Sequence, residues 1–491
     1  MIKVYLEGHE YRYDVYQLLK LFYFDEEILF IKEKALDNNQ GLLIESYLKN
    51  ENDNYIVNTN IYINGIYISS SNIDNINKID IKEDNLKKKK KIAIKKSIFD
   101  AISKICKKDV PWGILTGVRP TKIVHELMDK GIVEETILEV LMKQYKISRD
   151  KANLIINIAN NQRQFIYPID EKNFSLYISI PFCPSRCIYC SFPAYSLRKK
   201  SDLVNKYIEK LLFELEKVAE FTKDMKLQTV YIGGGTPTSI PSRDLQRIIE
   251  KVNNIYDQKK IKEFTVEAGR PDTINKEMLL MLKENGIDRI SINPQTMNDT
   301  TLKGIGRRHT TEDIRQTYEL ARKIGFKKIN MDIIIGLPEE GEKEINKTMN
   351  QILQLSPDNL TVHTLALKKA SKLRNERNNF TLQDAKTIRN MLNITMDYAK
   401  EMDMYPYYMY RQKQILGNFE NIGYTKKDKE CIYNMLIMEE KQTIIALGAG
   451  GVTKMVYPAE NRIERVPNVK DPNEYINRVE EMIERKRKYL R

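Results

Sequence analysis

The sequence is poor in cysteine, histidine and tryptophan, with five, four and one of them in 491 residues. Five cysteines make a weak disulfide framework for a chain of this length, and three of them fall between residues 183 and 190. In a reducing compartment such clustering favours metal binding over disulfide bridging. The scarce cysteines are therefore candidates for a metal centre.

Long apolar runs are absent as well. No uninterrupted apolar stretch is long enough to cross a bilayer. Charged residues interrupt the apolar runs of the first 20 residues, and no small-residue cleavage site follows them, so we expect no signal peptide. Without an export signal, the sequence predicts a cytoplasmic protein.

Positive charge is only moderately in excess over negative charge. The chain has 80 Lys and Arg against 67 Asp and Glu, which gives a net charge of +13. Such an excess suits an acidic partner, either nucleic acid or a small polycarboxylate. Much of the charge is scattered along the chain, so a solvated surface is the alternative interpretation, and we rank nucleic acid behind it.

The chain is long enough for two or three domains, and changes of pattern divide it into four parts. The expected parts are a small α+β N-terminal module (residues 1–82), a helical connecting region (83–170), a partial barrel (171–370) and a mostly helical C-terminal region (371–491). In the first module a helix is expected over residues 14–24, with strands at 42–48, 55–57 and 61–68. Helical spacing recurs over residues 92–105, 121–128, 134–145 and 149–164.

Strands and helices alternate after about residue 172. Short β-rich runs are expected at residues 175–181, 229–232, 264–268, 289–293, 328–335 and 359–365. Helical patterns between them cover residues 203–221, 243–256, 276–285, 311–323 and 342–354. This alternation is typical of βαβ units with a parallel sheet, and six units predict an α/β fold with a partial (β/α)6 barrel. In such barrels chemistry takes place at the C-terminal ends of the strands.

The strongest chemical signal is the spacing of Cys183, Cys187 and Cys190 directly after the first barrel strand. Three thiolates in one short loop suit a [4Fe–4S] cluster whose fourth iron stays open to another ligand. A structural zinc site normally needs a fourth protein ligand, and no nearby His or Cys supplies one. A zinc knuckle or three incidental buried thiols are the alternatives.

This CxxxCxYC pattern after a strand resembles the signature of the radical S-adenosylmethionine (SAM) superfamily. The longer string YISIPFC, from Tyr177 to Cys183, resembles the oxygen-independent coproporphyrinogen III oxidase family. That family commonly has His where this chain has Ser179, so a role for that His is not carried over. The resemblance implies that Tyr177 lies next to SAM near the reacting centre, as a catalytic residue.

The resemblance extends to the ends of the following strands. The segment GGGTP after the second strand matches the part of the family that grips the SAM amino group. Arg307 matches the SAM-binding arginine, with its neighbour Arg308 as the alternative. The residues that the resemblance assigns to SAM binding, besides Tyr177, are Gly234, Gly235, Thr236, Glu267, Gln295, Arg307, Asp332 and Ala366.

The segments PWGILTGVRPTKI, TVHTLALKKAS and YYMYRQKQILGNFENIGY are similar to the HemZ type within this family. The resemblance implies an oxidoreductase of porphyrin and heme biosynthesis, a coproporphyrinogen dehydrogenase. It would convert coproporphyrinogen III to protoporphyrinogen IX through a 5′-deoxyadenosyl radical, with a low-potential donor such as flavodoxin or ferredoxin. The substrate carries four carboxylates, and Arg270, Arg411 and Lys368 are candidates for a basic pocket.

Other functions stay open on the same core. A heme chaperone would keep the cluster without oxidase activity, and relatives of this core include methyltransferases, a heme-degrading enzyme and RNA-modifying enzymes. Of the remaining rare residues, we expect structural roles for His125, Cys106 and Cys431. His309 and His363 are expected to be structural too, although either could touch the substrate.

Overall fold

The computed structural model describes residues 1–33, 40–52, 54–76, 85–192, 195–196, 201–368, 370–412 and 415–490. The chain divides into two compact units, residues 1–159 and 160–491. The four-part division expected above is finer than this and stays a prediction, and its boundary at residues 82/83 lies outside the described residues. Among the helices of the described segments, none is long and apolar enough to span a membrane.

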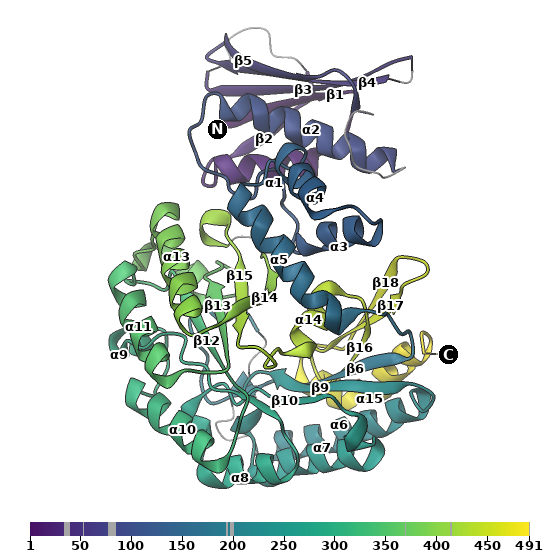
Figure 1. Ribbon diagram of the computed structural model, residues 1–491, viewed down its shortest axis with the longest axis vertical. Coiled ribbons are helices and arrows are strands. Elements are labelled where there is room, and N and C mark those ends of the chain that lie inside the picture. The colour runs from purple at the N-terminus through teal and green to yellow at the C-terminus, as the bar shows by residue number, and fades with distance from the viewer. Residues whose placement is uncertain are drawn as a thin grey trace. The chain divides into compact units, whose positions relative to one another are not determined.

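The first unit contains a mixed five-stranded sheet in the order β2-β1-β3-β4-β5 (Figure 1). The strands are β1 (Ile2–Glu7), β2 (Ile28–Ile31), β3 (Leu42–Glu51), β4 (Asn54–Ile63) and β5 (Ile66–Ile73). The single run expected over residues 61–68 is instead a hairpin. Asn64 and Gly65 both adopt positive φ, at 52° and 79°, and so turn the chain between β4 and β5.

Five helices complete this unit, and their predicted positions are confirmed. They are α1 (Arg12–Phe22), α2 (Leu86–Ser103), α3 (Thr121–Asp129), α4 (Glu134–Lys143) and α5 (Arg149–Ile166), which runs across the boundary between the units. Helix α2 contacts β4 and β5, and it buries Ile94, Ile98 and Ile102 at helical spacing. The segment between α2 and α3 contains Trp112, which is fully buried.

The second unit is built on an eleven-stranded sheet in the order β14-β15-β13-β12-β11-β10-β9-β6-β16-β17-β18. Its six predicted strands are present and all pair in parallel. They are β6 (Asn173–Ile180), β9 (Lys226–Gly234), β10 (Glu263–Val266), β11 (Arg289–Ser291), β12 (Ile329–Ile335) and β13 (Asn359–Thr364). The partial barrel expected from the sequence is therefore confirmed.

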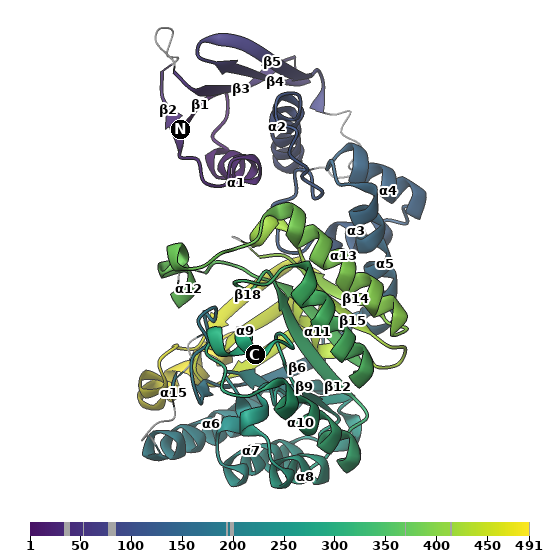
Figure 2. The same cartoon turned by 90° about the vertical axis from the view of Figure 1, so that its left-hand side faces the viewer.

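Helices follow these strands and lie along the outside of the barrel, as Figure 2 shows. They are α6 (Ser201–Phe221), α7 (Ser242–Ile255), α8 (Lys276–Glu284), α9 (Asp299–Gly304), α10 (Thr311–Ile324) and α11 (Glu342–Leu355). Helix α7 shows why they pack there: its buried Leu245, Ile248, Ile249 and Val252 form one apolar face, while charged residues occupy the other.

The region from residue 371 is less helical than expected. Besides α12 (Lys372–Asn375), α13 (Ala385–Glu401), α14 (Ile432–Glu439) and α15 (Pro472–Arg487), it contributes five strands. These are β14 (Tyr405–Tyr410), β15 (Asn421–Thr425), β16 (Thr443–Leu447), β17 (Val452–Tyr457) and β18 (Arg462–Pro467). Strand β15 pairs antiparallel with β13, and β16 pairs parallel with β6. The C-terminal region thus extends the barrel sheet at both edges.

A buried polar network fixes the glycine-rich patch that follows β16. Glu214 and Lys486 are both fully buried, and Nζ of Lys486 lies 2.7 Å from Oε1 of Glu214. The other carboxylate oxygen of Glu214 accepts hydrogen bonds from the hydroxyl of Tyr475 (2.6 Å) and the backbone N–H of Gly448 (2.8 Å). Gly448 has a φ of +84°, which favours glycine at this turn.

Candidate active site

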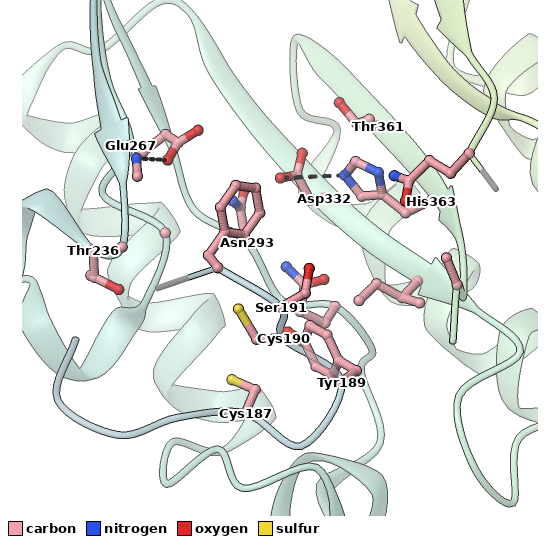
Figure 3. A pocket seen from close by; sticks show the side chains of 18 of the residues that line it. Cys187, Tyr189, Cys190, Ser191, Thr236, Glu267, Asn293, Asp332, Thr361 and His363 are labelled. Atoms are coloured by element: carbon pink, nitrogen blue, oxygen red, sulfur yellow. Dashed lines mark hydrogen bonds and ion pairs between the residues drawn. The ribbon is translucent and has the colours of Figure 1, made fainter. Parts of the chain in front are cut away.

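A cavity of about 600 Å³ lies at the C-terminal ends of the parallel strands. All twelve residues that the sequence analysis assigned to the cluster and to the SAM site line it. They are Tyr177, Cys183, Cys187, Cys190, Gly234, Gly235, Thr236, Glu267, Gln295, Arg307, Asp332 and Ala366. Figure 3 shows the thiols of Cys187 and Cys190 on one side of this cavity and Asp332 with His363 on the other.

The cysteine loop is anchored to three different elements. It begins at the two-residue strand β7 (Phe182–Cys183), which pairs with β8 (Tyr195–Ser196). The guanidinium of Arg270 donates to the backbone oxygen of Ser185 (3.1 Å), whose hydroxyl donates to the backbone oxygen of Gly306 (3.2 Å). The N–H of Ile188 donates to the oxygen of Ile305, after α9. The loop is therefore held in place by β8 and by the segments that follow β10 and α9.

The three thiols fit a cluster better than a single zinc ion. Among the described residues, no three His, Cys, Asp or Glu side chains are arranged around one ion position, as a zinc knuckle requires. Cysteines that hold a cluster bind different irons and do not need to converge on one point. Burial raises the pKa of Cys183 to about 11, so its free thiol is protonated near neutral pH and would release a proton on binding iron.

The GGGTP segment passes so close to the cysteine loop that only glycine fits. A Cβ on Gly235 would lie 2.5 Å from the backbone oxygen of Phe182 and 3.0 Å from Sγ of Cys183. The backbone is held there because Gly235 and Thr236 donate hydrogen bonds of 2.8 Å to the oxygens of Ile180 and Phe182. The glycines thus leave the backbone bare along the cavity wall, where a ligand can approach it.

Glu267 projects into the cavity just beyond the end of β10. Its carboxylate accepts hydrogen bonds from the hydroxyl of Tyr231 (2.6 Å) and the backbone N–H of Gly234 (3.2 Å). Burial, together with the charge of Asp332, raises the pKa of Glu267 to about 7, although these two hydrogen bonds favour the carboxylate. A positively charged ligand group beside it would restore the ionised form.

Asp332 and His363 form a pair across β12 and β13. Nε2 of His363 lies 3.7 Å from Oδ2 of Asp332, and its Nδ1 lies 3.1 Å from the hydroxyl of Tyr410. Asn330 donates a 2.7 Å hydrogen bond to the other oxygen of Asp332. Burial opposes the ionisation of Asp332, but His363 and Asn330 outweigh it and hold its pKa below the usual value. Asp332 is therefore an ionised acceptor at neutral pH.

Gln295 and Arg307 reach the cavity from the fourth strand and the loop beyond it. Gln295 adopts a φ of +68° and is fixed by backbone hydrogen bonds to Asp332 and Ile334 of β12. Arg307 is buried and donates to the backbone oxygen of Asn293 (2.5 Å), whereas Arg308 is exposed and does not line the cavity. Nε of Arg307 is buried, and no acceptor for it is found among the residues that the structure describes, which leaves a donor for a ligand.

Three stacked tyrosines form a wall that the sequence analysis foresaw only in part. Tyr231 and Tyr433 stack with ring centroids 4.4 Å apart, and Tyr177 stacks against both at 6.2 Å. Tyr433 comes from α14, more than 200 residues from the other two. Nothing in its local sequence marks it as a site residue. The three rings together give the cavity one aromatic side.

Several residues for which the sequence predicts a structural role, or to which no family role is carried over, lie outside the cavity lining. Ser179 is buried and donates to the backbone oxygen of Ala449, and it does not line the cavity. His309 is buried beside Asp272 and also lies outside the cavity lining. The thiol of Cys431 lies 3.2 Å from Oε1 of Glu263, away from the cavity. His125 and Cys106 belong to the first unit.

Arg411, a candidate for the basic pocket, does not line the cavity either. His363 does line it, so of the two histidines considered as substrate contacts only this one is in place. The lining residues that the sequence analysis did not name include Tyr189, Asn293, Asn330, Thr361, Tyr410, Tyr433 and Lys454. Asn330 and Thr361 could have been found from their period of two with Asp332 and His363 at the same strand ends.

Comparisons with known proteins agree with this geometry. Residues 177–352 match the family model of the radical SAM superfamily. The chain is 43% identical over 385 residues to the oxygen-independent coproporphyrinogen-III oxidase-like protein HemZ of Bacillus subtilis, covering 77% of each chain. It is 36% identical over 195 residues to the heme chaperone HemW of the same organism, covering 40% of this chain and 51% of HemW.

Among solved structures, the coproporphyrinogen III oxidase HemN of Escherichia coli, a radical SAM enzyme, has a TM-score of 0.54 at 20% identity. The match covers 66% of this chain and 73% of HemN, and it shows a shared fold. The HemZ match, at 43% identity over 77% of the chain, shows membership of a family and not only a shared fold. The protein is a member of the radical SAM superfamily, whose cofactors are a [4Fe–4S] cluster and SAM, and within it belongs to the HemZ family of oxygen-independent coproporphyrinogen-III oxidase-like proteins.

Proposed function

We propose that the protein is an oxidoreductase that converts coproporphyrinogen III to protoporphyrinogen IX by oxidative decarboxylation of two propionate side chains. The observation that carries this proposal is the single cavity in which three cysteine thiols, a bare glycine segment and an aromatic wall meet. The HemZ match adds support, because it covers most of the chain.

The residues at the two sides of the cavity would hold the two cofactors. Cys183, Cys187 and Cys190 would hold the cluster. Gly234, Gly235, Thr236, Glu267, Gln295, Arg307, Asp332 and Ala366 would hold SAM. When both are bound, they supply the reductive cleavage of SAM and, through it, the removal of a hydrogen atom from an unactivated C–H bond of the substrate.

The chain's own groups bind and orient these molecules. The carboxylate of Glu267 and the bare backbone around Gly234 would accept the ammonium group of SAM, and ionised Asp332 would accept hydroxyl hydrogen bonds from its ribose. Arg307 would turn its unused Nε–H toward the bound molecule. Tyr177 and Tyr433 would exclude water from the substrate side with their ring faces.

After the hydrogen atom is removed from the β-carbon of a propionate, the C–COO⁻ bond breaks. CO₂ leaves, one electron passes to an external acceptor, and a vinyl group remains. Two such rounds yield the divinyl product. The electron that opens each round would come from a low-potential protein donor such as flavodoxin or ferredoxin.

A heme chaperone is the second candidate, and the match to HemW favours it. This function predicts tight binding of heme by the loaded protein without consumption of coproporphyrinogen. An RNA-modifying function has less support. The first unit, which such an enzyme would need for RNA binding, carries 25 Lys and Arg against 23 Asp and Glu, so it has almost no net charge to attract phosphates.

The test is an anaerobic assay of the full chain with its cluster reconstituted. SAM, dithionite and coproporphyrinogen III are added, and 5′-deoxyadenosine and the porphyrin products are followed by mass spectrometry. We expect deoxyadenosine together with monovinyl and divinyl products. A Cys187→Ala variant should form neither, whereas Cys106→Ser, a thiol in the other unit, should behave like the wild type.

The other outcomes separate the candidates. Cleavage of SAM with untouched porphyrinogen would refute the oxidase, and heme titration of the same sample would then test the chaperone function. Formation of a methylated or ring-opened tetrapyrrole would point to a methyltransferase or a heme-degrading enzyme instead.

A further inference from the structure

Five cationic side chains line the cavity, and four of them already have acceptors. Arg270 donates to Asp272 (2.8 and 3.0 Å), and Arg307 donates to the oxygen of Asn293. The other two are Arg186, which donates to the oxygen of Ala370 (2.8 Å), and Lys454, whose Nζ lies 3.0 Å from Oε1 of Glu440. Arg270 and Lys454 are therefore paired with carboxylates, and Arg307 and Arg186 are held by backbone oxygens.

Lys368 is the fifth cation and differs from the others. Its side chain is half-buried in the cavity lining, and within the described part of the chain neither a carboxylate nor any other acceptor interacts with its ammonium group. Burial lowers the pKa of Lys368, and no neighbouring charge opposes this effect. The carboxylates of Glu267 and Asp332 line the same cavity but take their hydrogen bonds from Tyr231 and Asn330.

The loop that carries Lys368 is well braced. The N–H of Lys368 donates to the oxygen of Ala366 (3.0 Å), and the hydroxyl of Ser371 donates to the oxygen of Lys368 (2.8 Å). Arg374 donates to the oxygen of Leu367 (3.3 Å), and Arg186 fixes Ala370. The backbone under the lysine is thus positioned before any ligand arrives, so little ordering is left for binding.

An unpaired ammonium in such a place costs free energy, because it has lost part of its hydration without gaining an anion. A carboxylate that bound here would offset this cost and would accept a charge-assisted hydrogen bond from the ammonium group. The aromatic side chains of Tyr177, Tyr231 and Tyr433 line the same cavity and give it a largely apolar side. Together these features suit a ligand that is largely apolar in its body and carboxylated at its edge.

We propose that Lys368 is the specificity-determining residue that binds a carboxylate of the substrate in this cavity. This inference rests on the proposed function and names the group by which the site would select its substrate. Ala366, two residues before Lys368, is predicted to contact SAM. The anchored carboxylate would therefore be held on the wall of the cavity that also holds the cofactor.

The test compares Lys368→Gln, which removes the charge, with Lys368→Arg, which keeps it. Lys372→Gln is the matched control, because Lys372 begins helix α12 four residues after Lys368 and has an exposed side chain paired to Glu376. Binding of coproporphyrin III, the oxidised form that is not turned over, is measured anaerobically by fluorescence on the holoenzyme. The tetramethyl ester of coproporphyrin III, which has no carboxylate, is the second probe.

We expect Lys368→Gln to weaken binding of the free acid by about tenfold, the loss of one charge-assisted hydrogen bond. Binding of the ester and of SAM should stay unchanged, and both Lys368→Arg and Lys372→Gln should bind the acid like the wild type. Equal weakening of acid and ester, or no weakening at all, would overturn the role of Lys368. If the wild type converts coproporphyrinogen III while Lys368→Gln binds normally, only this inference falls. If the wild type binds neither probe, the proposed function falls with it.

Discussion

The hydroxyl of Tyr231, on β9, donates a 2.6 Å hydrogen bond to Oε1 of Glu267, which lies in the same cavity wall just beyond the end of the neighbouring strand β10. The second carboxylate oxygen is held by the backbone of Gly234. Glu267 is therefore oriented by groups that also favour its charge, yet burial keeps its pKa near 7. A carboxylate with such a pKa changes its charge in the range where the protein works.

The first prediction is a pH-dependent affinity for SAM. Below pH 7 Glu267 is mostly protonated and cannot balance an ammonium group, whereas above pH 7 it is ionised. Binding should therefore tighten as the pH rises, by about tenfold between pH 6 and pH 8, which is the change in the ionised fraction of one group with this pKa. Calorimetric titration of the reconstituted protein with SAM across this range measures it.

A Glu267→Gln variant provides the control. It keeps the size of the side chain but cannot ionise, so its affinity should be low and flat over the same range. A wild-type profile that is equally flat would show that the carboxylate of Glu267 does not contact the charged end of SAM.

The second prediction separates two adjacent arginines. Arg307 is buried in the cavity lining, whereas Arg308 is exposed outside it. Arg307→Ala should weaken SAM binding by roughly tenfold or more, because hydrogen bonds to charged groups contribute about 1.5–3 kcal/mol. Arg308→Ala should stay within twofold of the wild type. The reverse order would reassign the SAM contact to Arg308.

The third prediction concerns the close approach at Gly235. A methyl group there would collide with the backbone oxygen of Phe182 and press on the thiol of Cys183. Gly235→Ala should lower the unfolding free energy by about 1–3 kcal/mol, as overpacking does, and should reduce the iron bound per chain after reconstitution. Iron analysis and denaturant titration test the two effects.

Gly304→Ala is the matched control for this substitution. Gly304 ends the helix α9, and a Cβ there meets nothing within 4 Å. The control should keep its iron and its stability. If Gly235→Ala also kept its bound iron and its stability, the close approach of Gly235 to the cysteine loop would not matter for the cluster.

The fourth prediction is a large loss of stability when the buried pair of Glu214 and Lys486 is broken. Lys486→Met leaves the fully buried carboxylate without its cation and should cost about 3–5 kcal/mol. Adding Glu214→Gln should recover part of this loss, because it removes the unpaired charge. Thermal unfolding of the three proteins is the measurement, and additive losses in the double variant would contradict an ion pair.

Much of the barrel could be predicted because its strands and helices are long, periodic and separated by turn residues. The pattern was weaker in the C-terminal region, where TIIAL in β16 is a five-residue apolar run that fits a helix or a strand equally well. Its conformation is decided by β6, which precedes it by more than 260 residues. The conformational preferences of these five residues do not reveal a partner strand that lies so far away in the sequence.

The residues of the candidate site likewise fall into those that the sequence could predict and those that it could not. Residues that belong to a compact motif, such as the cysteine loop and GGGTP, could be identified from the sequence and the family resemblance. Tyr433 and Lys454 could not, because they reach the cavity from elements placed there only by tertiary packing. Likewise, only the structure distinguishes Lys368, whose ammonium meets no carboxylate within the described segments, from Arg270, which pairs with Asp272.

The parallel pairing of β6 with β16 also sets an order of events during synthesis. The cysteine loop directly follows β6, so one flank of the future cluster site is made early, but the strand that covers this edge is translated more than 260 residues later. Until then β6 has an unpaired edge, which is a site for wrong strand pairing. The edge of the barrel beside the cysteine loop is therefore closed only after β16 has been made.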